Sequence, residues 1–444
     1  MTNNYTSSES IVSSLVRDFY SPTKEEKEFV EQEYERLDKI LEGKIFQSGS
    51  YARYTAITPL NDLDVIWILS EENKKQIISG DLNLKDILND FAVKLKDEYN
   101  KTGVRVKTEA QEHSVRVEFV EKEGDFTIDV TPARELSEDN EFGYPLYKIP
   151  EIDTSGDVVW VKSDPKGYIE LAKRVNNNTP NFRKATKLLK AWRRAWKHKK
   201  NFGNVEFKLK SFHLELIIQD IIKKFPDYTI LDIVNCVFYN IENIIGSKNY
   251  PDRAGNRYVD DYIDELTGDQ KRIIKIASKS GAILLQKIQK KYENAEMVET
   301  LHKLASGEEF IEAYGYDISA NKLTTPIFCI EAIKNENQSS YKSGIVNLEN
   351  GDSVKFKAVF LPNFHHTKSK ISKYFYKVTN TGDDALKVRQ LRGEINLGST
   401  LNTTESAVFR GTHFVECFGV NDQVRSVLAY AICTVVIDDD IATK

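Results

Sequence analysis

Apolar positions recur with two different periods along the chain, and the first part of the sequence combines both. Helical spacing predicts a helix over 11–19, and Ser21 or Thr23, followed by acids, caps a second helix that ends near Leu41. Alternating segments then predict short strands around a helix at 84–99. These strands cover 44–48, 62–69, 103–107, 113–120 and 125–131, and the last two form a hairpin around a glycine turn. The pattern predicts an α+β core.

The later part of the chain changes from the helical period to the strand period. A loop rich in proline and acids at 135–153 precedes helical spacing over 179–315, and alternation begins beyond Asn321. The predicted helices are 182–196, 212–222, 229–245, 270–290 and 296–315, and the predicted strands are 328–333, 353–361, 373–380, 414–420 and 427–437. We expect three domains: a helix and α+β core over 1–165, a helical lobe over 166–318 and a β-rich domain over 319–444.

Composition identifies an ordinary globular chain, with 444 residues of which 40% are hydrophobic. No segment reaches the ~18 apolar residues of a membrane span, and the N-terminus lacks a secretory pattern. We therefore expect a cytoplasmic protein that has no membrane partner. The four cysteines have no C-x-x-C spacing, which predicts reduced, mostly buried thiols and neither a zinc site nor a disulfide framework.

Charge is distributed unevenly. The net charge of −5 argues against a surface that attracts DNA or RNA everywhere. Between Arg183 and Lys200, however, nine side chains are Lys or Arg and none is acidic. This run is either a solvated helix face or the source of a phosphate site, which would need only a few of these cations.

The candidate chemistry begins with two aspartates at the start of the predicted strand 62–69. Asp62 and Asp64 are two residues apart, so both carboxylates lie on one face of that strand. Asp129 alternates with apolar residues in the predicted strand 125–131, which leaves it free to face the same cavity. Neighbouring carboxylates repel one another and raise each other's pKa unless a cation lies between them. The three aspartates therefore predict a site for two Mg²⁺ ions, with Mn²⁺ as a substitute.

Gly49 and Ser50 follow a short predicted strand and precede Asp62 by eleven residues. A glycine there lets backbone N–H groups approach a triphosphate, and the serine hydroxyl supplies another hydrogen bond. A lone D-x-D is more often a solvated strand end, and a lone Gly-Ser is weak. Their combination with a third aspartate indicates nucleotidyl transfer.

This combination resembles the nucleotidyltransferase superfamily that includes DNA polymerase beta. The stretch GSYARYTAITPLNDLDVIWIL is similar to the active-site segment of the cGAS/DncV-like nucleotidyltransferases (CD-NTases) and of oligoadenylate synthases. The resemblance implies a polymerase-beta-like core and an enzyme that joins nucleoside triphosphates, ATP among them, without a template. It also implies that a ribose hydroxyl attacks an α-phosphate, that pyrophosphate leaves, and that Asp129 lies nearest the acceptor hydroxyl.

The segment RKATKLLKAWRRAW, followed by KLKSFHLELII, resembles the nucleotide-binding helices of the same family. On that resemblance Lys190 holds phosphate, Ser211 hydrogen-bonds it and Phe212 stacks on a base. Core packing is the alternative for Phe212. His213 and Glu215 are expected to be structural.

The C-terminal segments KVTNTGDDALKVRQLRGEI and FRGTHFVECFGV are similar to the AGS-C domain, a sensor-like domain fused to some of these enzymes. The residues that carry this similarity are Asn380, Gly382, Arg392, Gly393, His413 and Glu416. Each also has a structural explanation: a turn at Asn-Thr-Gly, a buried pair between Arg392 and Glu416, and a core histidine.

The resemblance implies synthesis of an oligonucleotide second messenger in antiphage defence (CBASS), with a downstream effector that binds the product. The product is either cyclic or linear, and a linear oligodeoxynucleotide fits the same residues. Two alternatives stay open: an RNA-end nucleotidyltransferase of the CCA- or poly(A)-adding type, and a non-catalytic nucleotide sensor.

Overall fold

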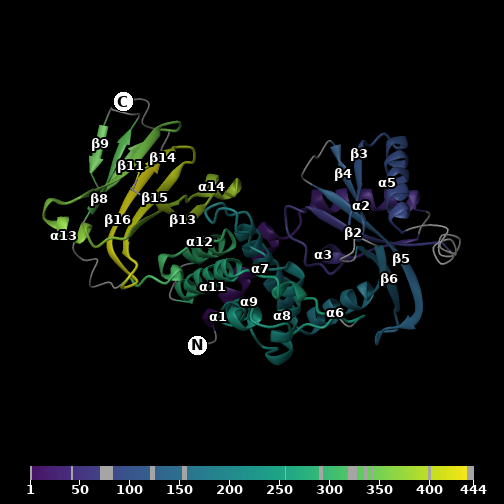
Figure 1. Ribbon diagram of the computed structural model, residues 1–444. Helices are drawn as coiled ribbons and strands as arrows, with labels where there is room; N and C mark the ends of the chain where they lie inside the picture. Colours follow the sequence, from purple (N-terminus) through teal and green to yellow (C-terminus); the bar gives the residue numbers. More distant parts are fainter. Residues whose placement is uncertain are drawn as a thin grey trace. The chain divides into compact units, whose positions relative to one another are not determined.

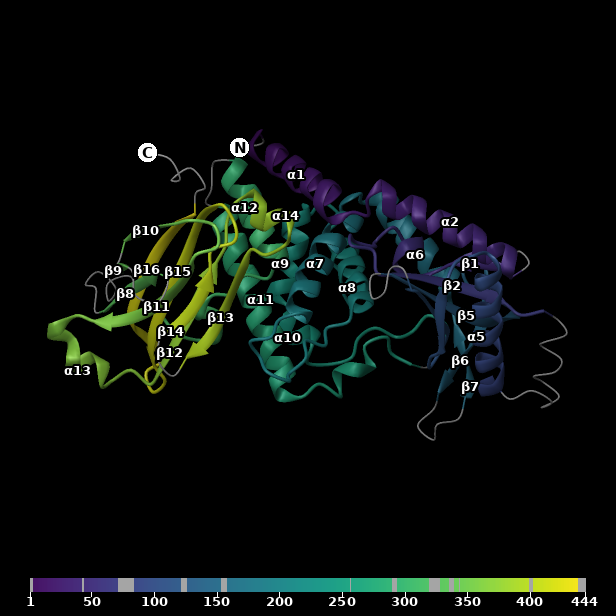
Figure 2. The ribbon, with the colours of Figure 1, turned by 90° about the horizontal axis from the view of Figure 1, so that it is seen from above.

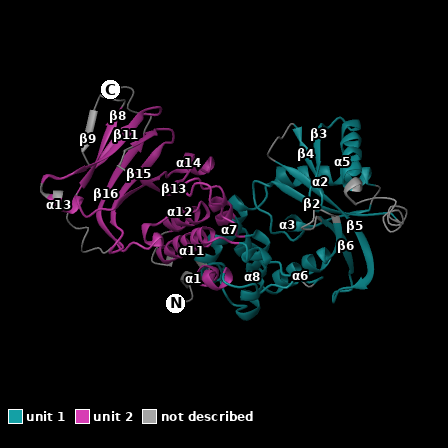
Figure 3. Ribbon diagram, viewed as in Figure 1, with its two compact units in different colours: residues 1–190, 210–236, 246–265 teal, residues 191–209, 237–245, 266–444 magenta. Residues whose placement is uncertain are grey.

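The computed structural model describes residues 3–41, 44–70, 84–120, 126–152, 158–255, 257–289, 294–318, 328–334, 339–342, 344–398 and 402–437. The chain divides into two compact units, which Figure 3 colours separately. Unit 1 comprises Met1–Lys190, Lys210–Cys236 and Gly246–Glu265, and unit 2 comprises Ala191–Leu209, Val237–Ile245 and Leu266–Lys444. The three-domain division stays a prediction.

Unit 1 begins with helix α1 (Asn3–Leu15), a π-helical turn η1 (Val16–Tyr20) and helix α2 (Lys24–Ile40) (Figure 1). The predicted cap is confirmed at Thr23, whose side chain accepts from the backbone N–H of Glu26 while the Glu26 carboxylate accepts from the N–H of Thr23. The same carboxylate accepts from the N–H of Leu60 at 2.8 Å. The start of α2 is thereby joined to the segment that enters the next strand of the sheet.

The seven strands of unit 1 form one sheet. They are β1 (Ile45–Gln47), β2 (Asp62–Ile68), β3 (Val106–Ala110), β4 (Val115–Phe119), β5 (Thr127–Asp139), β6 (Pro145–Ile152) and β7 (Val158–Ser163). The order is β1-β2-β5-β4-β3, and β6 and β7 extend the sheet from β5. Strands β2 and β5 are parallel, whereas β4 and β5 are antiparallel as the predicted hairpin requires. The glycine turn predicted at 121–125 lies outside the described residues.

Helices α2 and α5 (Leu84–Lys101) cover one face of this sheet (Figure 2). The core between them includes Leu37 of α2 and Leu95 of α5. On the sheet side it includes Leu63 and Val65 from β2 and Ile128 and Val130 from β5. Alternation then directs the intervening polar side chains of β2 and β5 to the other face.

The loop predicted at 135–153 is wrong, because this segment forms the end of β5 and all of β6. Asn140 makes the connection: its side-chain oxygen accepts from the N–H groups of Phe142 at 2.9 Å and of Tyr144 at 3.1 Å. Pro145 occupies the first position of β6, where a missing N–H is tolerated. The prolines and acids therefore marked a hairpin turn and its flanks.

Helices complete unit 1. They are α6 (Pro165–Asn178), the first part of α7 (Asn181–Lys197), α8 (Ser211–Lys224), most of α9 (Ile230–Tyr239) and a 3₁₀ turn η3 (Asp261–Ile263). The helices predicted at 182–196 and 212–222 correspond to α7 and α8. Helix α6 begins at a proline, and Asp164 caps it by accepting from the N–H of Gly167 at 2.9 Å.

Unit 2 contains helices and two sheets that share one core (Figures 1 and 2). Its helical elements include α10 (Ile241–Ile244), α11 (Gly268–Gln289), α12 (Asn294–Ala305), η4 (Ile311–Tyr314), η6 (Pro362–Phe364), α13 (His365–Lys368) and α14 (Asp383–Lys387). The five-stranded sheet has the order β10 (Ile345–Leu348), β16 (Ser426–Ile437), β15 (Gly411–Asn421), β12 (Lys373–Thr379) and β13 (Arg392–Gly398). The four-stranded sheet has the order β14 (Asn402–Ser406), β11 (Ser353–Phe360), β8 (Phe328–Lys334) and β9 (Ser339–Lys342).

The predicted change to a β-rich region is confirmed, and each of the predicted C-terminal strands corresponds to β8, β11, β12, β15 or β16. Strands β9, β10, β13 and β14 were not predicted because they are short or interrupted by polar residues. Cysteines 329, 417 and 433 are buried, and none of the four cysteines forms a disulfide. Among the described residues, no helix has the length and apolar character needed to cross a membrane.

Candidate active site

Three carboxylates gather on the face of the unit 1 sheet that lies opposite the core. Asp62 and Asp64 alternate with Leu63 along β2, and the Leu63 side chain is fully buried. Asp64 is the register partner of Asp129 on the parallel strand β5. Neighbouring strands run about 4.8 Å apart, so the Asp64 and Asp129 side chains leave the sheet side by side. The structure thus brings together the three predicted aspartates, while their catalytic role stays a prediction.

Burial, together with mutual repulsion, raises the pKa of Asp62 and of Asp64. Burial raises the pKa of Asp64 to about 6, and the charges of Asp62 and Asp129 add to the rise. Burial and then the charge of Asp129 also raise the pKa of Asp62, although Asp62 retains solvent access. An added cation would relieve both effects because it favours the ionised carboxylates.

Arg116 of β4 supplies one cation to this face. Its guanidinium donates from Nε to Asp129 Oδ1 at 3.1 Å and from Nη2 to Asp129 Oδ2 at 3.3 Å. The two residues are register partners on the antiparallel strands β4 and β5. This residue was missed, although its alternation with Val115 and Val117 placed it on the polar face of the predicted strand.

The donor chemistry of the three aspartates fits Mg²⁺, which prefers a few carboxylate oxygens together with water and phosphate. Across the described part of the chain, no group of three His, Cys, Asp or Glu side chains is arranged to hold a metal ion. In this arrangement Arg116 engages Asp129, so a metal that used all three carboxylates would have to share Asp129 with that guanidinium. Metal ligation by the three residues therefore stays a prediction.

Gly49 lies against the aspartates and opens the short helix α3 (Gly49–Ala52). Its φ is +63°, and a Cβ at this position would lie 1.6 Å from Asp64 Oδ2 and 2.5 Å from Asp64 Cγ. The N–H of Ser48 donates to the Asp64 carbonyl at 2.8 Å, which holds this segment on β2. Glycine is required here because any side chain would displace the Asp64 carboxylate.

Ser50 closes the turn that follows, since its carbonyl accepts from the N–H groups of Thr55 at 2.9 Å and Ala56 at 3.1 Å. The predicted contacts of Gly49 and Ser50 with a triphosphate are not tested by these hydrogen bonds. They do place both residues beside the carboxylates, where such a ligand would lie.

A buried ionic cluster centred on Glu215 of α8 lies next to this turn. Glu215 is fully buried and accepts from Arg53 Nε at 2.8 Å, Thr55 Oγ1 at 2.9 Å and Lys190 Nζ at 2.5 Å. Burial alone would raise the pKa of Glu215, but the charges of Arg53 and Lys190 outweigh it and lower that pKa to about 2. The structural role expected for Glu215 agrees with these contacts, and Arg53 is a member that sequence reasoning missed.

Lys190 is therefore not an independent ammonium at a phosphate site. Burial lowers its pKa, and Glu215 opposes that change. Its charge opposes the rise in the pKa of Asp62 and of Asp64, so the Lys190 ammonium interacts electrostatically with both carboxylates. The predicted phosphate contact is not tested, but it would require Lys190 to divide its three donors between Glu215 and the ligand.

Ser211 and Phe212 begin α8 near the same cluster. The Arg53 guanidinium lies 4.6 Å from the Phe212 ring centroid, and the Tyr168 ring meets Phe212 edge-on at 4.9 Å. Phe212 is half-buried, so packing accounts for part of its surface while stacking on a base stays a prediction. His213 is fully buried beside the Tyr262 hydroxyl at 2.9 Å, in agreement with its expected structural role.

Two further cations, Arg183 and Lys187, lie on α7, the helix that carries Lys190. Arg183 Nε donates to the Arg53 carbonyl at 3.2 Å, and its guanidinium lies 4.6 Å from the Tyr54 ring centroid. Burial lowers the pKa of Lys187 to about 8, with Lys27, Arg183 and Lys190 adding to the effect. The spacing of 183, 187 and 190 follows one helix face, which was the available signal in the sequence.

Comparisons with known proteins agree with this geometry. Residues 10–176 match the family described as the Second Messenger Oligonucleotide or Dinucleotide Synthetase (SMODS) domain. Residues 305–438 match the Adenylyl/Guanylyl and SMODS C-terminal sensor domain. No curated protein matches the chain in sequence.

Two solved structures of CdnC support the fold. The chain is similar to CdnC of E. coli MS115-1 with ATP, at 18% identity and a TM-score of 0.52, over 68% of this chain and 98% of that one. CdnC in complex with HORMA-deltaN gives 18% identity, a TM-score of 0.51 and the same coverage of 68% and 98%. The CD-NTase CdnG of Bradyrhizobium diazoefficiens with GTP matches at 13% identity and a TM-score of 0.49, over 69% and 99%.

The fold is therefore α+β, with a nucleotidyltransferase core and a β-rich C-terminal region. The two family matches assign residues 10–176 to the SMODS domain and residues 305–438 to the AGS-C domain, in agreement with the predicted resemblance to the CD-NTases.

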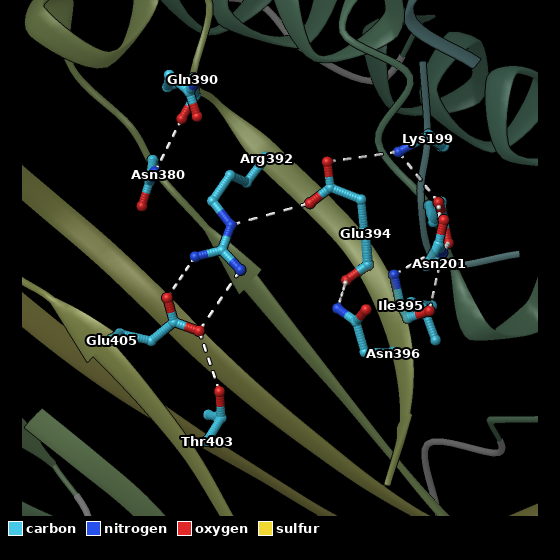
Figure 4. A network of polar contacts seen from close by, with 11 residues as sticks. Lys199, Asn201, Asn380, Gln390, Arg392, Glu394, Ile395, Asn396, Thr403 and Glu405 are labelled. Carbon is cyan, nitrogen blue, oxygen red and sulfur yellow. Dashed lines mark hydrogen bonds and ion pairs between the residues drawn. The ribbon is translucent and has the colours of Figure 1, made fainter. Parts of the chain in front are cut away.

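The AGS-C residues take structural positions in unit 2, and one expected pair is wrong. Arg392 Nη1 contacts Glu405 Oε2 at 2.5 Å, and Arg392 Nε lies 3.9 Å from Glu394 (Figure 4). Glu416 instead faces Lys377 at 3.6 Å and accepts from the Tyr430 hydroxyl at 2.8 Å. The reason is strand order: β12 separates β13, which carries Arg392, from β15, which carries Glu416.

The remaining AGS-C residues shape turns and the core. Asn380 Nδ2 donates to the Gln390 carbonyl at 2.8 Å, and Gly382 has φ +92° with the Arg410 carbonyl 3.1 Å from any added Cβ. Gly393 has φ +103°, and a Cβ there would lie 2.9 Å from Glu308 Cγ. His413 is buried and bonds through Nδ1 to the Thr381 N–H at 3.3 Å and through Nε2 to the Phe409 carbonyl at 2.7 Å, as expected of a core histidine.

Proposed function

We propose that this chain joins nucleoside triphosphates without a template into a cyclic or linear oligonucleotide, with release of pyrophosphate, as a second messenger in antiphage defence. The observation that carries the proposal is the gathering of Asp62, Asp64 and Asp129 on adjacent strands beside Gly49. A downstream effector that binds the product belongs to the same proposal. The SMODS and AGS-C matches support it.

In the proposed reaction Asp62, Asp64 and Asp129 would hold two Mg²⁺ ions, or Mn²⁺ in their place. The ions would supply charge neutralisation at the phosphates and a lowered pKa for the attacking hydroxyl. Asp129 would lie nearest that hydroxyl and accept its proton. Arg183, Lys187 and Lys190 would hold the triphosphate together with Gly49 and Ser50, while Ser211 and Phe212 would orient the nucleotide.

The direct test is incubation of the purified protein with each labelled NTP and dNTP in Mg²⁺ or Mn²⁺, followed by mass identification of the products. The double substitution Asp62→Asn with Asp64→Asn should lower product formation by at least about 1,000-fold, because a carboxylate pair is lost from the reacting centre. Asp97→Asn, on the exposed side of α5, is the matched control and should be unaffected. Product at the wild-type rate from the double variant would refute the proposed site.

A second candidate function is nucleotide binding without catalysis. It is favoured by the ion pair between Arg116 and Asp129, which engages a carboxylate that the reaction requires. Binding of ATP without pyrophosphate release in Mg²⁺ would support it, provided that Arg116→Gln did not restore activity. Restored or increased activity in Arg116→Gln would instead identify this ion pair as a competitor of the metal.

A further inference from the structure

A pocket of about 330 Å³ lies within unit 2, and none of its lining residues is assigned above to catalysis. Elements far apart in the sequence supply its walls: the segment after α7, helix α11, the end of η4, strands β12 and β13, and the turn before β16. Its lining residues are Asn201, Phe202, Val205, Arg272, Ile273, Tyr314, Tyr316, Lys373, Phe375, Ile395, Leu397 and Arg425. The volume lies at the lower end of the range for small-molecule sites, which suits one nucleotide unit.

Aromatic rings form one side of the pocket. The Phe202 and Tyr314 rings are nearly parallel, with an interplanar angle of 11° and centroids 6.4 Å apart. Phe375 lies 6.1 Å from the Tyr314 centroid and 5.7 Å from that of Tyr316. Such rings offer flat apolar faces, and stacking of a nucleobase on an aromatic side chain contributes roughly 1 to 3 kcal/mol.

A buried network fixes the orientation of this aromatic side. Glu309 is fully buried and accepts from the Tyr314 hydroxyl at 2.5 Å, from Asn201 Nδ2 at 3.0 Å and from the N–H of Ile395 at 2.9 Å. Lys199 neutralises it at 3.0 Å. Figure 4 shows Asn201 and Ile395 beside Lys199 in this network. Because these partners hold Tyr314 and Asn201 in place, a ligand would meet a pre-ordered wall.

Three cations line the pocket, and among its described lining residues there is no Asp or Glu. The Arg272 side chain is 65% exposed and lies 3.6 Å from Asp269. Lys373 pairs with Asp422 at 2.7 Å, and that carboxylate also accepts from the Tyr316 hydroxyl at 2.6 Å. Arg425 donates to the Tyr314 carbonyl and lies 4.2 Å from the Tyr316 ring centroid. Two carboxylates thus face three cations, which leaves an excess of positive charge for an anion.

We propose that this pocket binds a nucleotide, with the base against Phe202, Tyr314 and Phe375 and the phosphate at Arg272, Lys373 and Arg425. The site goes beyond the proposed catalytic function because it is built from other residues. Two ligands would supply the required base and phosphate: a mononucleotide of the cell, and the oligonucleotide that the enzyme itself is proposed to make. Leu397 is 64% exposed on the pocket wall, where a negative charge would repel either one.

The test uses the full chain with Asp62→Asn and Asp64→Asn, which prevents turnover, in EDTA. Titration calorimetry with AMP, GMP and the 5′-phosphorylated diadenylate pApA measures affinity and the number of sites. Leu397→Glu should weaken binding at least 10-fold. Arg272→Gln combined with Lys373→Gln should weaken it at least about 100-fold, since each charged hydrogen bond contributes ~1.5 to 3 kcal/mol and two are lost.

Two matched controls lie elsewhere in unit 2. Val388→Glu places the same new charge on an exposed apolar residue outside the pocket, and Lys355→Gln removes an exposed cation from β11. Neither should change the affinity. If Leu397→Glu lowered the unfolding midpoint, its loss of affinity could come from unfolding. The double variant of Arg272 and Lys373 would then test the site, because both side chains are exposed and their replacement should leave the fold intact.

Location is tested separately by photocrosslinking with 8-azido-AMP and mapping of the labelled peptides. Label on the segments that contain Phe202, Tyr314 or Phe375, and its loss in Leu397→Glu, would support the proposal. Equal affinities of the Leu397→Glu and parent proteins for all three nucleotides, or no binding at all, would overturn it. Tighter binding of pApA than of AMP and GMP would identify the oligonucleotide as the source, and the reverse order would identify the mononucleotide.

Discussion

Two sites in unit 1, one around Glu215 and one around Asp64, show how the surroundings of a carboxylate determine its pKa. Glu215 is fully buried, yet Arg53, Thr55 and Lys190 surround it, and its pKa falls to about 2. At Asp64, burial raises the pKa to about 6, and the charges of Asp62 and Asp129 add to the rise. Burial raises the pKa of both groups, and only at Glu215 do neighbouring cations reverse that effect.

The two sites differ in whether the protein supplies enough positive charge to balance the carboxylates. The Glu215 cluster contains its own cations and needs no ligand. The aspartate cluster contains one guanidinium, that of Arg116, for three carboxylates. A strained charge arrangement of this kind is typical of functional sites, whereas a saturated one is typical of structural ion networks.

The largest expected effect is on stability, for Glu215→Gln. Loss of this carboxylate leaves Arg53 and Lys190 buried without a counter-charge, which typically costs 3 to 5 kcal/mol. Urea unfolding of the full chain should show this loss in the free energy of unfolding. Glu206→Gln is the control, since the Glu206 side chain is 75% exposed. Equal unfolding midpoints for the wild type and Glu215→Gln would show that the cluster does not stabilise the fold.

Gly49→Ala should come next, with a loss of nucleotidyl transfer of at least about 100-fold. The added Cβ would lie 1.6 Å from Asp64 Oδ2, so the carboxylate or the turn must move. Gly103→Ala controls for backbone strain: its φ is +82°, and a Cβ there would meet nothing within 4 Å. Both variants pay the left-handed backbone cost of ~1 to 2 kcal/mol, so only the clash distinguishes them. Similar activity of the two would contradict the proposed contact.

Asp64→Asn should raise stability at neutral pH while it removes activity. Because the pKa of Asp64 is about 6 in the folded state and 3.8 ordinarily, the folded state binds more protons between these values. Stability of the wild type should therefore fall as pH rises from about 4 to 6, and the variant should lack this contribution. The ceiling is ~3 kcal/mol, and partial solvent access reduces the expected gain at pH 7.5 to about 1 kcal/mol.

Thermal unfolding at pH 4.5 and pH 7.5, with and without Mg²⁺, measures the Asp64 effect. Mg²⁺ should raise the unfolding temperature of the wild type more than that of Asp64→Asn, since the ion needs the carboxylate. An Asp64→Asn variant less stable than the wild type at pH 7.5 would show that the ionised Asp64 carboxylate does not destabilise the fold.

The smallest expected effect is on the pH dependence of substrate binding. The pKa of Lys187 is about 8 instead of 10.5, so its ammonium loses its proton as pH rises through 8. KM for the triphosphate should rise about 3- to 10-fold between pH 7 and pH 9 in the wild type, because one phosphate-binding charge is lost. Lys187→Arg should remove this rise and Lys184→Arg should keep it. A rise that persists in Lys187→Arg would assign it to another group.

Much of the aspartate site followed from local pattern. Alternation along 62–69 and 125–131 placed the three aspartates on the polar faces of their strands, and the parallel pairing of β2 with β5 then brought those faces together. Arg116 obeys the same alternation and could have been included. Arg53 could not, because its partner Glu215 lies 162 positions later in the chain.

The errors and omissions have a common cause. The segment 135–153 was assigned to a loop from its prolines and acids, but pairing with β5 and β7 makes β6 a strand. Arg392 was paired with Glu416 although strand β12 lies between their strands. In both cases the deciding contact is with a strand distant in sequence.

Local periodicity was thus sufficient for the α+β class, for most helices and long strands, and for the faces on which the aspartates lie, because side-chain direction repeats every 2 or 3.6 residues. Three features arose only on folding: the pairing of Glu215 with cations, the raised pKa of Asp64, and the pocket in unit 2. That pocket is lined by Phe202, Arg272, Tyr314, Lys373 and Arg425, among others. Charge interactions and stacking depend on distances of a few ångströms between residues that no local period relates.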